Sequence, residues 1–437
     1  MLIKISKYFD YKILYSASNI LTKYLGSLLS IIFLAIILDE KERGFYFTFL
    51  SLVALKIFFE LGLGNIITQY VAKEIGKSKN GKININPIIS FVKKWFGIIS
   101  VLLFFFLLFF GDFFFIDQNE LVDWRTPWIL TCLGTSFFLF ISPFLSIVSG
   151  LGSLEEVLKI RTISGLFRLI TFWLGLLFGF KLYSLGISII VEVFCLVYFY
   201  KKRLYVTLIP HLSFNINAKF NYYRDIFPYQ WKIAISWISG YFIFQLFTPL
   251  VFKYIGPEAS GKMGMTMMFI NAMGAFPILW INTKIPEYSR LYGESKIIKL
   301  FNEFYSNLKS SIVVMLVLIF FFISVYYTLS VSEFFKNIFD LNNYILTLKP
   351  ITFLLVALFF NHIISSYAIV LRANMKEPYL YTSVLMGFLV LISSFLTIND
   401  YGINGICLAY LISTLIIFIP SRIIYIKHKN NYLNEDA

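Results

Sequence analysis

Two charged residues lie in the middle of a long apolar segment. In GFYFTFLSLVALKIFFELGLGNIITQY, residues 44–70, Lys56 and Glu60 are four residues apart, so on a helix they share one face and can pair. A charged side chain at the centre of a bilayer helix costs roughly 2.5 to 3.5 kcal/mol on insertion scales. Two interpretations remain open: the pair joins helices, or it lines a hydrated cavity.

Other polar residues recur inside apolar segments. Ser16, Asn19, Lys23, Ser27 and Ser30 follow a three- or four-residue period and predict one polar stripe on a helix. Because Lys23 has no acid one turn away in its own helix, we expect it to line a cavity. The predicted cavity residues are Lys23, Lys56, Arg168, Asn19, Asn271, Asn282, Gln245 and Asn361. The candidates for ion coupling are Glu60, Glu192 and His362.

Some of these residues have ordinary explanations as well. Arg168 lies about two turns from the predicted cytoplasmic end of its span, so snorkelling to the headgroups fits it as well as a function. Snorkelling is the expected role of Lys253 and Lys284, which lie at span ends. A single His362 is more often a hydrogen-bonded structural histidine than a proton carrier.

Metal and nucleotide sites are not predicted. Three cysteines and three histidines are scattered without metal-ligand spacing, and no cofactor is expected. GKSKNGK (76–82) and GPEASGK (256–262) have the G-x-x-x-x-G-K spacing, but both lack the Ser or Thr that holds magnesium. The predicted partners therefore include no nucleotide and no nucleic acid.

The elements that must position these residues are membrane spans. The chain has 437 residues, 58% hydrophobic and 14% charged, and a soluble protein carries about 25% charge. Its net charge of +14 then marks cytoplasmic loops rather than a nucleic-acid surface. Twelve apolar segments are long enough to span a membrane: 13–38, 45–66, 90–111, 127–150, 162–180, 184–200, 229–252, 262–283, 308–330, 349–371, 379–397 and 404–426. The positive-inside rule places both termini in the cytoplasm.

The two halves of the chain resemble each other at an offset of about 220 residues. Three ordered matches support this repeat, and they align Gly44 with Gly261, Gly165 with Gly387, and Gly186 with Gly405. Because six spans are an even number, the halves share one orientation, which is a parallel repeat typical of transporters. We predict an all-α polytopic membrane protein with a six-helix bundle at 1–203, a basic cytoplasmic linker at 204–228 and a second bundle at 229–437.

Several stretches resemble a known family. DEKERGFYFTFLSLVALKIFFELGLGNIITQYVAKE, with its ELGLG ending, is similar to span two of lipid-linked oligosaccharide flippases. The central LIPHLSFNINAKFNYYRDIFPYQW and the later IGPEASGKMGM also resemble that family. The chain is thus similar to O-antigen (Wzx-like) flippases of the multidrug, oligosaccharidyl-lipid and polysaccharide (MOP) exporters. The resemblance implies a MATE-like fold and a multi-pass protein of the bacterial inner membrane.

The resemblance implies a transporter, not an enzyme. Its expected substrate is an undecaprenyl-diphosphate-linked oligosaccharide, moved by alternating access, with Lys23, Lys56 and Arg168 holding the diphosphate. The expected partners are membrane lipids and the polymerase and chain-length regulator of the same pathway. A multidrug cation antiporter of the same superfamily remains an alternative, since Glu60 and Glu192 could bind cations. A membrane glycan polymerase or ligase is the alternative from another class, although no predicted outside loop is long.

Overall fold

Two compact units make up the chain. The computed structural model describes residues 26–435, except for 28, 78–83, 119–121, 206–207, 210–220, 333–339 and 374–376. Contacts divide the chain into Met1–Ile238 (unit 1) and Ser239–Ala437 (unit 2). The predicted boundaries at 203 and 229 stay a prediction, since much of the predicted linker lies outside the described residues.

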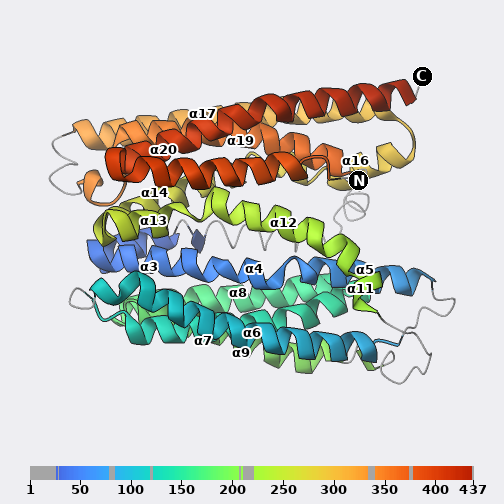
Figure 1. The fold of residues 1–437 in the computed structure, drawn as a ribbon, viewed down its shortest axis with the longest axis horizontal. Helices are drawn as coiled ribbons and strands as arrows, with labels where there is room; N and C mark the ends of the chain where they lie inside the picture. The colour runs from blue at the N-terminus through green and yellow to red at the C-terminus, as the bar shows by residue number, and fades with distance from the viewer. Residues whose placement is uncertain are drawn as a thin grey trace, which may run out of the picture. The chain divides into compact units, whose positions relative to one another are not determined.

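Unit 1 is helical throughout its described part. Helix α3 (Glu40–Val53) begins with a capping box, in which the Asp39 carboxylate accepts a hydrogen bond from the Glu42 amide and the Glu42 carboxylate accepts one from the Asp39 amide. A 3-10 turn (Ala54–Lys56), another (Ile116–Gln118) and a π-helical turn (Tyr200–Leu204) extend three of the helices. The helices are α3 (Glu40–Val53), α4 (Ile57–Glu60), α5 (Leu63–Lys77), α6 (Asn86–Phe115), α7 (Arg125–Gly150), α8 (Leu154–Leu177), α9 (Tyr183–Phe199), α11 (Tyr222–Asp225) and the first part of α12 (Phe227–Phe244) (Figure 1).

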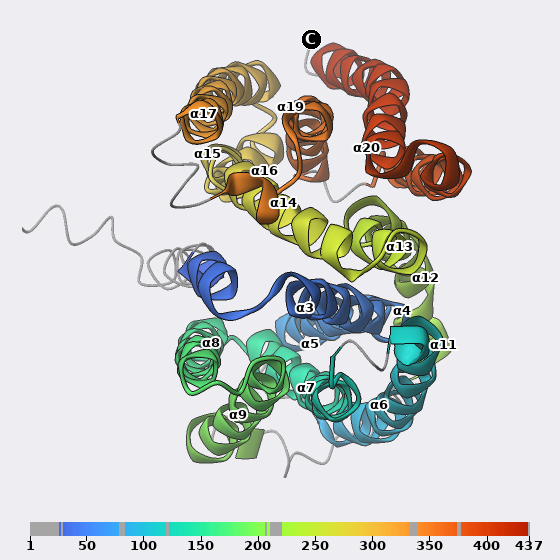
Figure 2. The same ribbon diagram turned by 90° about the vertical axis from the view of Figure 1, so that its left-hand side faces the viewer.

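Helix α7 is the central helix of unit 1. It lies among α5, α6 and α9 (Figure 2). The apolar 18-residue stretch of α7 is 67% buried, whereas the corresponding stretch of α6 is 28% buried. Gly186 lets α9 approach α7 closely, because a Cβ on this residue would lie 2.9 Å from the backbone nitrogen of Thr131 in α7. Helix α6 therefore presents most of its apolar surface outward, as a helix facing lipid must.

The second span is broken at its centre. Helices α4 and α5 meet at a 40° bend, where Leu61 has φ 50° and Gly62 has φ 71°. A Cβ on Gly62 would come 2.5 Å from Cγ2 of Ile233 in α12. A glycine is needed at this position both for its backbone conformation and for the close approach of α12.

Unit 2 is also helical in its described part. Gln245 lies in a second break, where the chain bends by 48° between α12 and α13. The last long helix contains a kink at Gly402, where φ is 56° and ψ is −139°. The helices are α13 (Phe247–Tyr254), α14 (Pro257–Ala275), α15 (Leu279–Asn282), α16 (Ile285–Gly293), α17 (Ile297–Val331), α19 (Leu348–Arg372) and α20 (Leu380–Glu435). Helix α19 packs against both α17 and α20 (Figure 2).

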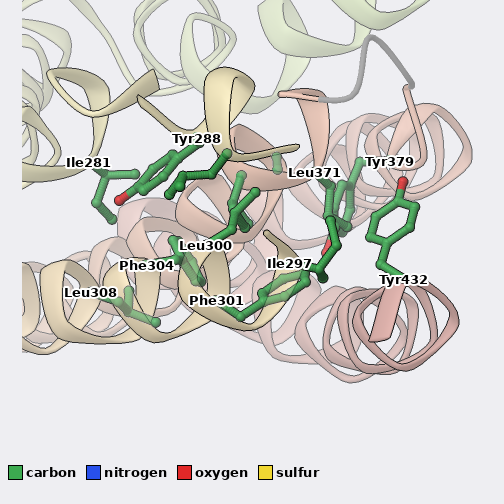
Figure 3. Packing of buried hydrophobic residues seen from close by; sticks show 13 residues of the cluster. Ile281, Tyr288, Ile297, Leu300, Phe301, Phe304, Leu308, Leu371, Tyr379 and Tyr432 are labelled. Carbon is green, nitrogen blue, oxygen red and sulfur yellow. The ribbon is translucent and has the colours of Figure 1, made fainter. Parts of the chain in front are cut away.

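An aromatic and aliphatic cluster fills one end of unit 2. Tyr288 and Phe304 are fully buried, with ring centroids 6.1 Å apart, and Tyr379 and Tyr432 close the other side of the cluster (Figure 3). The Asn307 amide donates to the Tyr288 hydroxyl over 2.9 Å, so this buried polar tip is satisfied. The cluster joins α15, α16, α17 and α19 to Tyr379, just before α20, and to Tyr432 near the end of α20.

The described helices match the predicted spans. Eight helices are long and apolar enough to cross a membrane, and two bent pairs also qualify. Because α20 contains the predicted spans 379–397 and 404–426, these helices account for eleven of the twelve. The first, 13–38, lies partly outside the described residues. The prediction of an all-α, multi-pass membrane protein is confirmed.

Candidate functional site

Five charged side chains from three segments of unit 1 form one group, called here the charge cluster. Lys56 ends the 3-10 turn before α4, and Glu60 is the last residue of α4. Arg161 and Arg168 both belong to α8, seven residues apart and therefore on one face. Glu192 lies on α9, which packs along α8 (Figure 2).

One ion pair joins α8 to α9. Nη1 of Arg168 donates to Oε2 of Glu192 over 3.0 Å. The Arg168 side chain is 37% exposed, whereas that of Glu192 is only 13% exposed. The acid is thus withdrawn between the helices, and the guanidinium remains accessible from one side.

A second acid interacts with two cations. The charges of Lys56 and Arg161 both act on the Glu60 carboxylate. Arg161 is exposed and also interacts electrostatically with Glu192. Cations and acids therefore alternate from Lys56 through Glu60, Arg161 and Glu192 to Arg168.

Helix α7 supplies a wall for this cluster. Nζ of Lys56 lies 4.8 Å from the centroid of the Phe138 ring, a cation–π distance. A Cβ on Gly64 would come 3.1 Å from Oε1 of Glu60 and 3.2 Å from Oγ of Ser146. Because Gly64 has no side chain, the Glu60 carboxylate has room beside the first turn of α5, where the helix dipole favours an anion.

The cluster has the chemistry of an oxyanion site. Three cations and two acids leave a net charge of +1 when all are ionised. Guanidinium and ammonium groups form charge-assisted hydrogen bonds to phosphate and carboxylate oxygens. Since charges inside membrane spans are costly, a cluster of five is expected to serve a function.

The predicted site residues of unit 2 lie on several helices. Gln245 is half-buried at the α12–α13 break, and Asn271 on α14 and Asn282 at the end of α15 are exposed. On α19, Asn361 donates to the Tyr410 hydroxyl over 2.9 Å and so links α19 to α20. These contacts give Asn361 a structural partner within its own unit.

His362 belongs to a neutral hydrogen-bonded chain. Oγ of Ser311 donates to the Pro277 carbonyl over 2.7 Å. Nε2 of His362 lies 2.7 Å from Oγ of Ser311. Because the single Ser311 proton is used on Pro277, Nε2 must carry the hydrogen and donate to Ser311. The histidine therefore stabilises the break between α14 and α15.

Two predicted cavity residues lie where the structure describes nothing, and one member of the charge cluster was not predicted. Asn19 and Lys23 lie outside the described residues. Arg161 was missed because the span was predicted to begin at 162, whereas α8 begins at Leu154. The seven-residue spacing from Arg168 was the available signal.

The position of Arg168 also changes. It lies near the middle of α8, because the helix begins at Leu154 and not at the predicted 162. Snorkelling and a function both stay predictions for this residue. The helix extends through polar residues because Lys159 pairs with Glu155 at 2.9 Å and with Glu156 at 3.0 Å in its first turns.

Comparisons with known proteins bear on the fold. Neither protein-family profiles nor curated protein sequences match the chain. Among solved structures, an inward-facing multidrug resistance MATE family transporter of the MOP superfamily matches with a TM-score of 0.64 at 15% identity, covering 98% of this chain and 100% of that one. The lipid II flippase MurJ, in an inward closed conformation, gives a TM-score of 0.60 at 15% identity over 97% and 91%.

A third similar structure is the Vibrio cholerae MATE transporter VcmN in its bent form, with a TM-score of 0.55 at 13% identity over 97% and 95%. The fold is that of the MOP transporters. The predicted MATE-like fold is therefore confirmed, and it is shared by proteins named for multidrug resistance and by one named for lipid II.

Proposed function

We propose that the protein is a flippase that moves undecaprenyl-diphosphate-linked oligosaccharide units, of O-antigen or capsule type, across the bacterial inner membrane by alternating access. The MOP fold and the resemblance of ELGLG and the central basic stretch to Wzx-like flippases support the proposal. The observation that carries it is the charge cluster, with its two arginines on one face of α8.

The substrate explains why charges lie inside unit 1. A polyprenyl tail can stay in hydrocarbon, but a diphosphate cannot cross it without compensating charge. Lys56, Arg161 and Arg168 supply that charge, and the planar guanidinium groups match phosphate oxygens. Exposed amides such as Asn271 and Asn282 are candidates for contacts with sugar hydroxyls.

A multidrug cation antiporter is the second candidate function. It is favoured by Glu60 and Glu192, two acids within apolar helices, and by the similarity of the fold to MATE transporters. The net positive charge of the cluster opposes it, because each acid faces a cation of the protein. A membrane glycan polymerase or ligase is the third candidate function. For the flippase, the proposed partners are the polymerase and the chain-length regulator of the same pathway.

The test is complementation in the native host. The gene is deleted and replaced by wild type, by Lys56→Ala or by Lys309→Ala, an exposed lysine on α17 that serves as the matched control. Polyprenyl-diphosphate-linked glycans are then measured in each membrane leaflet. We expect accumulation in the cytoplasmic leaflet, reversed by wild type and Lys309→Ala but not by Lys56→Ala.

Two results would contradict the proposal. Sensitivity to cationic drugs without glycan accumulation would favour the antiporter. Accumulation in the outer leaflet would instead indicate a polymerase or ligase.

A further inference from the structure

The ion pair between α8 and α9 already holds an arginine of the cluster against an acid of the protein. Arg168 is 37% exposed, yet one of its nitrogens donates to the carboxylate of Glu192 at 3.0 Å. A carboxylate and a phosphate are both oxyanions, and both accept charge-assisted hydrogen bonds from a guanidinium. Glu192 thus occupies the kind of position that a phosphate oxygen of a substrate would take.

We propose that Glu192 is an internal competitor for the substrate phosphate at Arg168. The inference rests on the proposed function and adds how the same site releases its ligand. A diphosphate displaces the Glu192 carboxylate from Arg168 when it binds, and Glu192 returns to the guanidinium when the diphosphate leaves. The affinity for the anion is thereby held low enough for turnover.

The arrangement of the neighbours supports this exchange. Glu192 comes from α9, whereas both arginines come from α8, so the acid can separate from them by a rotamer change of its own. Arg161 also interacts with Glu192, so the acid reduces the positive charge seen by a ligand at both arginines. A guanidinium has five N–H donors, which allows a phosphate and a carboxylate to exchange without loss of every contact.

A competitor and a structural acid have opposite effects when removed. Loss of a structural acid disorders the arginines and weakens anion binding. Loss of a competitor strengthens anion binding, because the ligand no longer has to break an internal ion pair. Slower release should then reduce kcat as KM falls.

The experiment compares Glu192→Gln with wild type in nanodiscs and proteoliposomes. The substitution keeps the size of the side chain and an oxygen that can accept from Arg168, so folding should be preserved. Glu156→Gln is the matched control, since Lys159 retains Glu155 as an ion-pair partner. Affinity is measured for farnesyl diphosphate and for inorganic pyrophosphate, and transport kinetics for a lipid-linked diphosphate glycan.

We expect Glu192→Gln to bind both probes roughly tenfold more tightly, with KM and kcat both reduced. Glu192→Asp, which retracts the carboxylate by one methylene, should fall between wild type and Glu192→Gln. The control should match wild type.

Equal or weaker binding of farnesyl diphosphate by folded Glu192→Gln would overturn the inference while leaving the flippase proposal intact. Failure of wild type itself to bind farnesyl diphosphate would instead contradict the proposed function.

Discussion

The two units handle buried polar groups in different ways. In unit 1, the charge cluster alternates cations and acids and includes an exposed arginine, Arg161. In unit 2, His362, Ser311 and the Pro277 carbonyl form a neutral chain in which the His362 and Ser311 side chains are buried.

This difference separates binding from stability. A neutral chain whose members satisfy one another has little left to offer a ligand, whereas exposed cations keep donors available. Substitutions in the charge cluster should therefore change ligand affinity, and those in the neutral chain should change stability with little effect on affinity.

The largest effect should come from Arg168→Gln. It removes the hydrogen-bonded cation of the partly buried Glu192 carboxylate, which costs roughly 2 to 3 kcal/mol of stability, and it removes a phosphate donor. The double variant Arg168→Gln with Glu192→Gln should recover the unfolding midpoint but not transport. Recovery of transport as well would mean that the pair is only structural, and the two units would then not differ.

Gly62→Ala should have the next largest effect, because it disturbs the bend that positions Glu60. The new Cβ would lie 2.5 Å from Cγ2 of Ile233 at a φ of 71°, at a cost of about 2 kcal/mol. Gly152→Ala is the matched control, since its φ is 95° but nothing lies within 4 Å of the added Cβ. Equal losses in thermal unfolding would show that the backbone strain alone matters.

Ser311→Ala tests the neutral chain. It removes the partner of both His362 and the Pro277 carbonyl, and we expect a loss of about 1.5 kcal/mol in a chemical unfolding titration. Ser310→Ala, which removes only an exposed bond to the Ser306 carbonyl, should cost much less. A drop in farnesyl diphosphate affinity in folded Ser311→Ala would contradict the separation between units.

The smallest effect should come from an ion pair of unit 1 whose lysine is exposed. Nζ of Lys181 donates to Glu42 over 2.6 Å, and this hydrogen bond raises the pKa of the lysine above its ordinary 10.5. The stabilisation of the fold by this ion pair is complete below pH 10.5 and is lost as the pH rises through the raised pKa of Lys181. Lys181→Met should flatten the alkaline part of the stability profile without changing transport. An unchanged profile would show that the pair contributes nothing.

The sequence predicted the helices better than the breaks between them. Apolar segments of about 20 residues identify spans because a bilayer demands them. The bend at Leu61–Gly62 could not be predicted from ELGLG, because it depends on the packing of Ile233 against Gly62. Likewise, the polar first turns of α8 obscured its start, and with it Arg161.

Pairing between segments was less predictable still. The four-residue spacing of Lys56 and Glu60 indicated an interaction that the structure shows as electrostatic. Nothing in the sequence places Glu192 against Arg168, because that contact depends on how α8 and α9 pack. The hydrogen bonds of Asn361 to Tyr410 and of His362 to Ser311 were equally unpredictable, and the roles predicted for Asn361 and His362 stay predictions.

The most direct test of the account is the affinity of the purified wild-type protein for four probes: farnesyl diphosphate, farnesyl monophosphate, farnesol and tetraphenylphosphonium. Titration calorimetry in nanodiscs keeps the lipid tail constant across the first three while phosphate is removed stepwise. If the charge cluster binds an oxyanion, affinity should fall in that order and tetraphenylphosphonium should not bind. Tight binding of tetraphenylphosphonium together with no preference for the diphosphate would contradict the account and identify the two acids as a cation site.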